Sequence, residues 1–319
     1  MRAVELKDNQ LSFRTDLAEP VPAAGEVNVR VIKAGICETD LQLVKGYMEF
    51  DGVLGHEFVG IADSGRYEGC RVVGEINCPC GRCSTCHAAR PRHCPHRSVV
   101  GILNRDGAFA DRLAIPEHCL HPVPDHVPDE HAVFVEPVAA ACRISEQQLV
   151  QPTDSVLILG AGRLGNLCAQ VLKSTCQELL VVGKHSWKLL RLAECELDCE
   201  ELSSFGPQAK WDVVVDCTGS ATGLETAMQC VRPCGTIVLK TTIVSKQSIH
   251  MAPIVIDETR IVGSRCGPFE PALELIAENR LQLAPLISAT YDISEAVEAF
   301  QVSTRTNVLK VQLNIGTAT

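Results

Sequence analysis

A dense group of thiols and imidazoles lies between residues 78 and 94, which read CPCGRCSTCHAARPRHC. Five cysteines and two histidines within seventeen positions can hold a metal ion, form disulfide bonds or carry redox chemistry. The N-terminal residues MRAVELKDNQ lack the apolar core of a secretory signal, so we expect a cytoplasmic protein in a reducing environment. In that environment a dense cysteine group favours a metal site over a set of disulfide bonds.

Three separated fragments, GICETD, GHE and VEPVA, contain a second possible set of metal ligands. They supply one thiolate, one imidazole and two carboxylates, from Cys37, His56, Glu57 and Glu136. This mixture of soft and intermediate ligands suits Zn²⁺, and three protein ligands leave one coordination position open for substrate or water. Each fragment alone carries little weight, because a single histidine is more often structural than metal-binding. Their order, ahead of a dinucleotide-binding pattern, favours a reactive zinc site.

A glycine-rich pattern follows in SVLILGAGRLGNLCAQV, where Gly160, Gly162 and Gly165 have GxGxxG spacing. The pattern directly follows an apolar run typical of a strand and opens a stretch typical of a helix, which is the context of a dinucleotide-binding fold. Gly160 permits the tight turn, Gly162 lets the backbone approach a pyrophosphate, and Gly165 lets the helix pack on the sheet. Backbone N–H groups at the helix start then face the diphosphate. A glycine-rich turn without a ligand is the alternative.

The end of the second strand in this region departs from the pattern of NAD sites. Such sites usually have Asp or Glu about 20 residues after the glycines, to bind the ribose 2′-hydroxyl. Here the strand ends LLVVGKHSWK, with Gly183 in place of the acid and Lys184 and His185 after it. The missing carboxylate relieves repulsion of a 2′-phosphate and the cations attract it, so NADP is favoured over NAD. A solvated turn with incidental positive charge is the alternative and leaves NAD open.

Two kinds of fold must position these residues, because the pattern of the sequence changes near residue 140. Before it, short apolar runs such as EVNVRVIKAG, FVGIAD, GCRVVGE and FADRLAI lie between turn residues, which predicts an antiparallel barrel or sandwich. After it, SVLILG, LLVVG, WDVVVDCTG and GTIVLKTT alternate with helical stretches, which predicts a parallel sheet covered on both faces. The tail predicts helices in PALELIAENRL and ISEAVEAFQ and a closing strand, NVLKVQL.

The composition is that of a globular protein of 319 residues, 46% of them hydrophobic, which is long enough for two domains. The net charge is −10, and no basic run is interleaved with aromatics, so we expect no nucleic-acid partner. No stretch approaches the roughly 18 apolar residues of a membrane helix, so we expect no membrane partner. Many of the seventeen cysteines lie in apolar runs such as LCAQVL and are expected to be small buried side chains.

The fragments GICETD, GHE and VEPVA, the cysteine-rich stretch and GAGRLG occur in the order found in the medium-chain dehydrogenase/reductase family. The chain resembles its zinc-dependent alcohol and polyol dehydrogenases, of the sorbitol and threonine dehydrogenase type, over essentially its whole length. The resemblance implies an α/β plus β fold. A GroES-like β-barrel catalytic domain, residues 1–139 and 268–319, would be interrupted by a Rossmann NAD(P)-binding domain, residues 140–267. This interruption would explain why the strand NVLKVQL closes the sequence after the helices.

The resemblance also implies roles for the fragments of the reactive site. Cys37 and His56 would bind a catalytic zinc ion, and Glu57 would be a permanent or an exchangeable ligand. Glu136 matches the carboxylate that polyol-type members place where other alcohol dehydrogenases have a third ligand cysteine. It would bind zinc directly or through water.

Two further residues match the family's proton-handling and positioning groups. Thr39 matches the hydroxyl that passes on the substrate proton, and Asp40 matches the acid that orients a zinc-binding histidine. In the implied mechanism zinc lowers the proton affinity of the substrate hydroxyl, Thr39 relays the proton, and a hydride passes to the nicotinamide. The family often reads C-x-T-D-L-H, with a histidine that passes the proton to solvent, whereas this chain reads CETDLQ. Gln42 cannot titrate, so proton release needs water, Glu57 or another group.

The cysteine-rich stretch matches the family's structural zinc lobe. The matching positions are Cys80, Cys83, Cys86 and Cys94. Four thiolates around one ion make a closed tetrahedral site that contributes folding energy and has no place for substrate. Cys78, His87 and His93 are left outside this set, with Cys78 as a substitute ligand the alternative. A zinc ribbon for nucleic acid is a second alternative, which the acidic net charge disfavours.

The leading hypothesis is a zinc-dependent alcohol or polyol dehydrogenase that uses NADP(H), or else NAD(H), with one catalytic and one structural zinc ion. The predicted cofactor-binding residues are Gly160, Gly162, Arg163, Leu164, Gly165, Gly183, Lys184, His185 and Thr218. Glu49 and Asp51, between the first two ligand fragments, favour a hydroxylated small-molecule substrate, with solvated loop charges as the alternative. The rival functions are an NADPH-dependent carbonyl reductase and a catalytically inactive zinc or nucleotide sensor. The family implies a homodimer or homotetramer.

Overall fold

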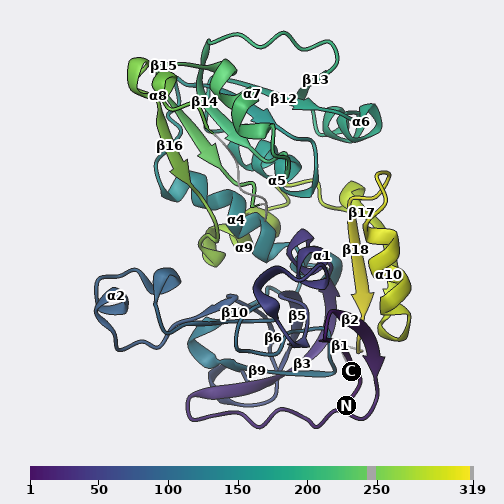
Figure 1. Cartoon of the computed structure of the whole chain (residues 1–319). Coiled ribbons are helices and arrows are strands. Elements are labelled where there is room, and N and C mark those ends of the chain that lie inside the picture. Colours follow the sequence, from purple (N-terminus) through teal and green to yellow (C-terminus); the bar gives the residue numbers. More distant parts are fainter. Residues whose placement is uncertain (243–248, 317–319) are drawn as a thin grey trace. The chain divides into compact units, whose positions relative to one another are not determined.

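The computed structural model describes residues 1–242 and 249–316, which fold into two compact units (Figure 1). The first unit contains Met1–Glu136 and Ala272–Thr319, and the second contains Pro137–Pro271. The chain leaves the first unit within α4 (Val135–Glu146) and returns within α9 (Phe269–Ala277). The boundaries expected from the sequence, after residues 139 and 267, lie within α4 and just before α9.

The first unit is built around the long strand β3 (Glu26–Gly35). Valines alternate with polar residues along its first half, which places Val27, Val29 and Val31 in the core. This strand pairs antiparallel with β5, β9 and β18 in a seven-stranded sheet. The other strands of the unit are β1 (Ala3–Lys7), β2 (Gln10–Arg14), β4 (Gly52–Val53), β5 (Glu57–Ala62), β6 (Arg71–Gly74), β7 (Asn77–Cys78), β8 (Ser98–Val99), β9 (Arg112–Pro116), β10 (Leu120–Pro122), β17 (Ile287–Asp292) and β18 (Lys310–Asn314). The antiparallel strands predicted for the first part of the chain are confirmed.

Helices in the first unit are short. They are α1 (Glu38–Val44), α2 (Ser84–His87), α3 (Asp129–Ala132) and α10 (Ala296–Ser303), with 3₁₀ turns at Tyr47–Glu49, Gly65–Tyr67, Pro91–His93, Glu117–Cys119, Ala284–Leu286 and Ile293–Glu295. The predicted closing strand is confirmed as β18, which lies beside β3 with Gln312 opposite Gly35 (Figure 1). The two helices predicted in the tail are confirmed as α9 and α10. The returning segment therefore adds β17 and β18 to the seven-stranded sheet that contains β3.

The second unit contains a six-stranded, fully parallel sheet in the order β13-β12-β11-β14-β15-β16. Its strands are β11 (Ser155–Leu159), β12 (Glu178–Gly183), β13 (Asp198–Glu201), β14 (Trp211–Asp216), β15 (Val231–Leu239) and β16 (Arg260–Gly263), and its helices, besides most of α4, are α5 (Arg163–Leu172), α6 (Ser186–Glu194), α7 (Gly223–Cys230) and α8 (Ala252–Ile256). The central strands are apolar because side chains on both faces are buried, as Leu157, Val214 and Ile237 are. The predicted Rossmann-type parallel sheet is confirmed. Its strand order changes direction at β11, where ligands bind in this architecture.

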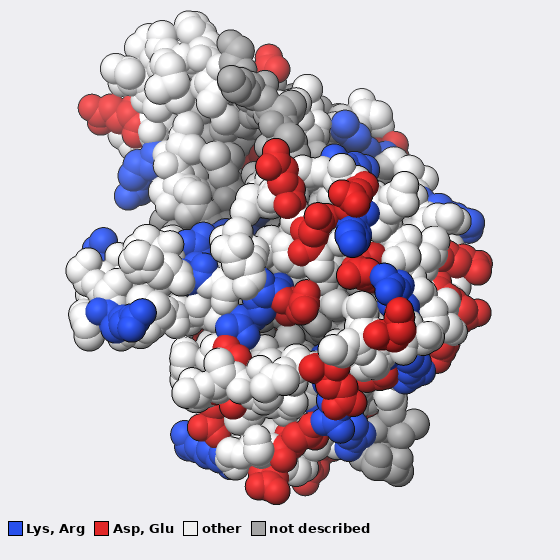
Figure 2. Space-filling view, turned by 60° about the horizontal axis from the view of Figure 1, so that its bottom comes forward, with Lys and Arg blue, Asp and Glu red and all other residues white. Residues whose placement is uncertain are grey.

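Within residues 1–242 and 249–316, no helix is both long and apolar enough to cross a bilayer. On the face drawn in Figure 2, acidic and basic side chains are interspersed. The chain as a whole carries 39 acidic and 29 basic residues.

An aromatic pair joins the two chain segments of the first unit. Phe109 is fully buried, and its ring meets that of Phe300 from α10 edge to face, with centroids 5.9 Å apart. We expect Phe109→Ala to lower the free energy of unfolding by about 3–5 kcal/mol, because it leaves a cavity between the segments. Urea denaturation of both proteins measures this difference. Phe300→Leu, which keeps most of the volume, should cost less than about 1.5 kcal/mol. Equal losses for the two variants would contradict the argument.

Candidate functional site

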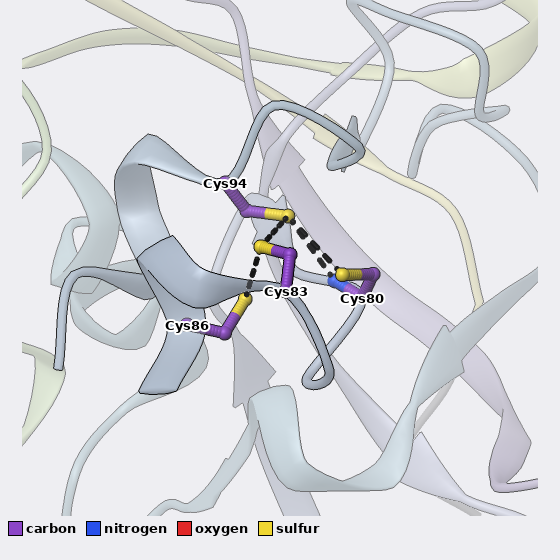
Figure 3. Close-up of side chains that lie close together, drawn as sticks. All are labelled: Cys80, Cys83, Cys86 and Cys94. Atoms are coloured by element: carbon purple, nitrogen blue, oxygen red, sulfur yellow. Dashed lines mark hydrogen bonds between the residues drawn. The ribbon is translucent and has the colours of Figure 1, made fainter. Parts of the chain in front are cut away.

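Four cysteines of the first unit form a compact sulfur cluster (Figure 3). They are Cys80, Cys83, Cys86 and Cys94, brought together by the short helix α2 and the turn Pro91–His93. The sulfur of Cys83 lies 3.5 Å from that of Cys86 and 3.7 Å from that of Cys94, which in turn lies 3.5 Å from the Cys80 sulfur. Zn–S bonds of about 2.3 Å in a tetrahedron separate the sulfurs by about 3.8 Å, so the cluster has the dimensions of a four-thiolate zinc site.

The cluster stabilises thiolate charge at one of its members, whereas desolvation and the hydrogen bond to Cys83 raise the pKa of Cys86 to about 12. The backbone N–H of Cys86 donates to the sulfur of Cys83 and, against desolvation, lowers the pKa of Cys83 from 9.0 to about 6. A thiolate is the form that binds metal. Within the described residues, Cys78, His87 and His93 are not members of the cluster, and the buried Cys78 thiol lies 4.0 Å from the carbonyl of Ile76.

A second cluster forms where β3 ends and β5 begins. Gly35 pairs with Glu57 across these antiparallel strands, which brings Cys37 beside His56 and Glu57. One ligand atom from each of these three residues lies within 4.8 Å of the others. The turn after β3 is held by Asp40, whose Oδ2 accepts a hydrogen bond of 2.8 Å from the backbone N–H of Cys37. The cluster thus depends on strand pairing between segments that are distant in sequence.

His56 is 2% exposed and lies in a negative environment. Its Nδ1 is 3.3 Å from Oδ1 of the buried Asp40, the residue expected to orient it. Burial lowers the pKa of His56, but the Asp40 carboxylate and the Cys37 sulfur outweigh it and raise the pKa well above 6.5. The same negative surroundings favour a bound dication.

Glu57 is 1% exposed, and its two carboxylate oxygens have different surroundings. Oε2 accepts a 2.5 Å hydrogen bond from Nζ of Lys310, whereas Oε1 has no hydrogen-bond partner among the described residues. A buried charged oxygen without a partner is unfavourable unless a ligand completes it. Together with a thiol and an imidazole it makes a donor set that fits Zn²⁺.

The other residues expected at this site are less tightly grouped. The hydroxyl oxygen of Thr39 lies 3.8 Å from the sulfur of Cys37. Gln42 donates a 2.8 Å hydrogen bond to Glu38, one helical turn before it in α1. Glu136, half-buried in the first turn of α4, is not a member of the three-residue cluster within the part of the chain that is described.

Glu49 and Asp51 line a surface pocket of about 410 Å³ in the first unit, together with residues 102–106. Asp51 accepts a 3.0 Å hydrogen bond from the backbone N–H of Asp8, which gives it a role in the loop itself. Glu49 and its neighbour Met48 both have positive φ angles, of 50° and 65°. This side of the pocket is therefore a tight, non-glycine turn that carries acidic groups.

In the second unit the glycine-rich pattern joins β11 to α5. Gly160 has a φ of 106°, and a Cβ atom there would lie 2.6 Å from the carbonyl oxygen of Cys217. At Gly165 a Cβ would lie 1.8 Å from the carbonyl oxygen of Gly160, whereas Gly162, the N-cap of α5, has open space around it among the described residues. Arg163 and Leu164 form the first turn of α5 behind it. The three glycines thus have the steric surroundings expected of a pyrophosphate-binding turn.

At the end of β12, Gly183 packs directly against this turn. A Cβ there would lie 2.6 Å from Cβ of Ala161 and 3.0 Å from Cδ2 of Leu189. Lys184 and His185 follow on the exposed side, and His185 is the N-cap of α6. The end of β12 is therefore followed by a lysine and a histidine and carries no carboxylate of its own.

The carboxyl ends of β14 and β15 carry a polar network that includes the predicted Thr218. Its backbone N–H and its hydroxyl donate to Oδ1 of Asp216, at 2.9 and 2.7 Å, and the hydroxyl of Thr241 donates to the same oxygen at 2.9 Å. Asp216 and Thr241 were not predicted from the sequence. The polar residue that ends each apolar run, in WDVVVD and in IVLKTT, was the available signal.

The fingerprint glycines allow stability and binding to be separated. Gly165→Ala should destabilise the second unit by about 1–3 kcal/mol or more, because the methyl group meets backbone. Gly162→Ala should leave the melting temperature unchanged and weaken NADP⁺ binding roughly tenfold or more, since its methyl group points into free space at the start of α5. Thermal melting and fluorescence titration measure the two effects. Unchanged nucleotide affinity in Gly162→Ala would argue against a pyrophosphate at this turn.

Comparisons with known proteins agree with this geometry. The family model described as alcohol dehydrogenase GroES-like domain matches residues 23–125, and the one described as zinc-binding dehydrogenase matches residues 198–278. Starvation-sensing protein RspB of Escherichia coli K12 is 26% identical over 93% of both chains, and a sorbitol dehydrogenase of Halalkalibacterium halodurans is 28% identical over 92% of this chain and 93% of its own.

Two solved structures have nearly the same fold. One is an alcohol dehydrogenase from Escherichia coli CFT073 complexed with NADH, with a TM-score of 0.90, 26% identity and 99% of both chains covered. The other is a putative zinc-binding dehydrogenase from Sinorhizobium meliloti 1021 bound to NADP, with a TM-score of 0.89, 26% identity and coverage of 98% of this chain and 99% of that chain. The chain belongs to the zinc-dependent medium-chain alcohol and polyol dehydrogenase family. It is an oxidoreductase with a GroES-like domain and an NAD(P)-binding domain.

Proposed function

We propose that the protein oxidises an alcohol or polyol hydroxyl group, or reduces the corresponding carbonyl, with NADP(H) as the preferred cofactor. The observation that carries the proposal is the buried cluster of Cys37, His56 and Glu57, with one carboxylate oxygen left unpartnered. The sorbitol dehydrogenase relative supports a hydroxylated substrate. The proposal includes a cytoplasmic enzyme that forms a homodimer or homotetramer and has neither nucleic acid nor membrane as a partner.

In this proposal Cys37, His56 and Glu57 hold a catalytic zinc ion, with Glu136 as the further carboxylate ligand. With Nδ1 of His56 beside Asp40, Nε2 is the ring nitrogen left to bind metal. Zinc, when bound, lowers the proton affinity of a substrate hydroxyl. The hydroxyl of Thr39 would accept that proton while passing its own on to water, and a bound nicotinamide would supply the hydride acceptor.

The four-cysteine cluster would hold a second, structural zinc ion. Its thiolates leave no open coordination position, so it contributes to folding and not to chemistry. Cofactor binding would use the fingerprint turn and Thr218, with Lys184 and His185 near the 2′-phosphate of NADP. The relative bound to NADP supports this preference, and the relative bound to NADH keeps NAD(H) as the competing cofactor.

The two zinc ions should be separable by mutation. We expect two equivalents of zinc in the wild-type chain and one in Cys37→Ser. The kcat/KM of Cys37→Ser should fall roughly 10³-fold or more, because several kcal/mol of transition-state stabilisation by the metal are lost. Cys83→Ser should also lose one zinc ion, but its main effect should be a lower melting temperature. Elemental analysis and NADP⁺ reduction with a panel of alcohols and polyols measure these outcomes. Nucleotide binding without turnover of any alcohol or carbonyl would favour the sensor hypothesis.

Cofactor preference should depend on the cations after β12. For the wild-type enzyme, we expect a higher kcat/KM with NADP⁺ than with NAD⁺. In Lys184→Glu, we expect kcat/KM to fall roughly 10–100-fold with NADP⁺ and to stay unchanged with NAD⁺, since a hydrogen bond to a charged group contributes about 1.5–3 kcal/mol. Lys210→Glu is the matched control, because Lys210 is exposed just before β14, at the amino end of the sheet. Equal or better turnover of the wild-type enzyme with NAD⁺ would overturn the preference.

A further inference from the structure

Lys310 is a buried lysine whose surroundings the proposed reaction does not explain. It lies on β18, in the part of the chain that returns to the first unit, and its side chain is only 2% exposed. Its ammonium group lies 2.5 Å from Oε2 of Glu57, whose side chain is 1% exposed. Burial of both charges is costly, so a pair of this kind is a weak explanation for stability by itself.

The ammonium group reaches all three segments that carry the expected zinc ligands. It donates a 3.3 Å hydrogen bond to the carbonyl of Ile36, the residue before Cys37. It bonds to Glu57, the residue after His56, and lies 5.8 Å from the ring centroid of Phe134, two residues before Glu136. One side chain from the end of the sequence therefore touches each ligand-bearing segment.

The Glu57 carboxylate of this pair lies in the space beside Gly35. A Cβ atom on Gly35 would lie 2.5 Å from Oε2 of Glu57 and 2.8 Å from Cγ1 of Val133, so the carboxylate fills the space that glycine leaves. The hydrocarbon part of Lys310 packs beside the same glycine, since its Cδ lies 3.5 Å from the same Cβ position. With Oε2 held in this way, Oε1 is the oxygen that faces no partner in the described structure.

We propose that Lys310 is a positioning residue of the metal site, which holds Oε2 of Glu57 so that Oε1 alone is presented to the ion beside Cys37 and His56. This inference rests on the proposed function, because it needs a metal ion at that cluster. The Glu57 carboxylate would then lie between the Lys310 ammonium group and the metal ion. Lys310 contacts neither substrate nor cofactor in this scheme; it acts through Glu57.

Cobalt substitution tests the role without relying on catalysis. In Lys310→Met, we expect Co²⁺ to bind the Cys37-dependent site roughly 10–100-fold more weakly, the usual loss when the group that orients a ligand is removed. The visible spectrum of the remaining bound Co²⁺ should also change. Subtracting the spectrum of Cys37→Ser removes the contribution of the four-cysteine cluster, and a chromophoric chelator measures the affinities.

Lys240→Met is the matched control for loss of a buried lysine. Lys240 is 8% exposed, and its ammonium group donates to the carbonyls of Ala140 and Arg265 and to the hydroxyl of Ser264. We expect this variant to lose thermal stability while Co²⁺ affinity and the Cys37-dependent spectrum stay as in the wild type. A change of the Lys310→Met kind in this control would overturn the specific role of Lys310.

A double-mutant cycle with Glu57→Gln shows whether Lys310 acts through Glu57. If it does, Lys310→Met should cause little further loss of Co²⁺ affinity once Glu57 is already Gln, and the neutral pair should fold because no unpaired charge is buried. The same loss in both backgrounds, or wild-type affinity and spectrum in Lys310→Met, would overturn the inference. Absence of any Cys37-dependent Co²⁺ signal in the wild-type protein would instead refute the proposed metal site, and this inference with it.

Discussion

The pairing of β3 with β5 at Gly35 and Glu57 is the contact on which the rest of the proposed metal site depends. It brings Cys37, which follows β3, beside His56, which precedes β5. Gly35 is also the residue that Gln312 of β18 faces, so both segments of the first unit pair at this glycine. A side chain there would collide with the carboxylate of Glu57 and with Val133. The position needs glycine because a charged group occupies the space of its side chain.

The two cysteine-containing clusters differ in what must fold before they form. The four-thiolate cluster closes a short loop, so its assembly costs little chain entropy and its spacing is visible in the sequence. The cluster of Cys37, His56 and Glu57 exists only after strands have paired and Asp40 has fixed the turn before α1. This difference explains why the more conspicuous motif is the one that we assign to folding, and the dispersed one is the one that we assign to chemistry.

Much of the fold followed from apolar periodicity and turn residues, because strands buried on both faces, such as SVLIL and WDVVVD, leave a clear pattern. β13 was missed, since its sequence DCEE forms a charged edge strand that buries no continuous apolar run. The proposed ligand residues Cys37, His56 and Glu57 were found as motifs, but Lys310 was not. Its partner lies 253 positions away, and a lysine between Leu309 and Val311 gives no local signal that its charge is buried.

At the proposed cofactor site, the packing of Gly183 against Ala161 limits which residues can determine the preference between NADP and NAD. Because Gly183 lies against Ala161 of the fingerprint turn, a carboxylate side chain at the end of β12 would force that turn away from the strand. Such a displacement would disturb the same backbone that approaches the pyrophosphate. Selectivity for the ribose must then come from residues beyond the strand, and Lys184 and His185 are the first exposed positions. Exposed side chains lose more entropy on binding than a carboxylate fixed on a strand. A cofactor preference set there is accordingly easier to shift by substitution than one built into the sheet.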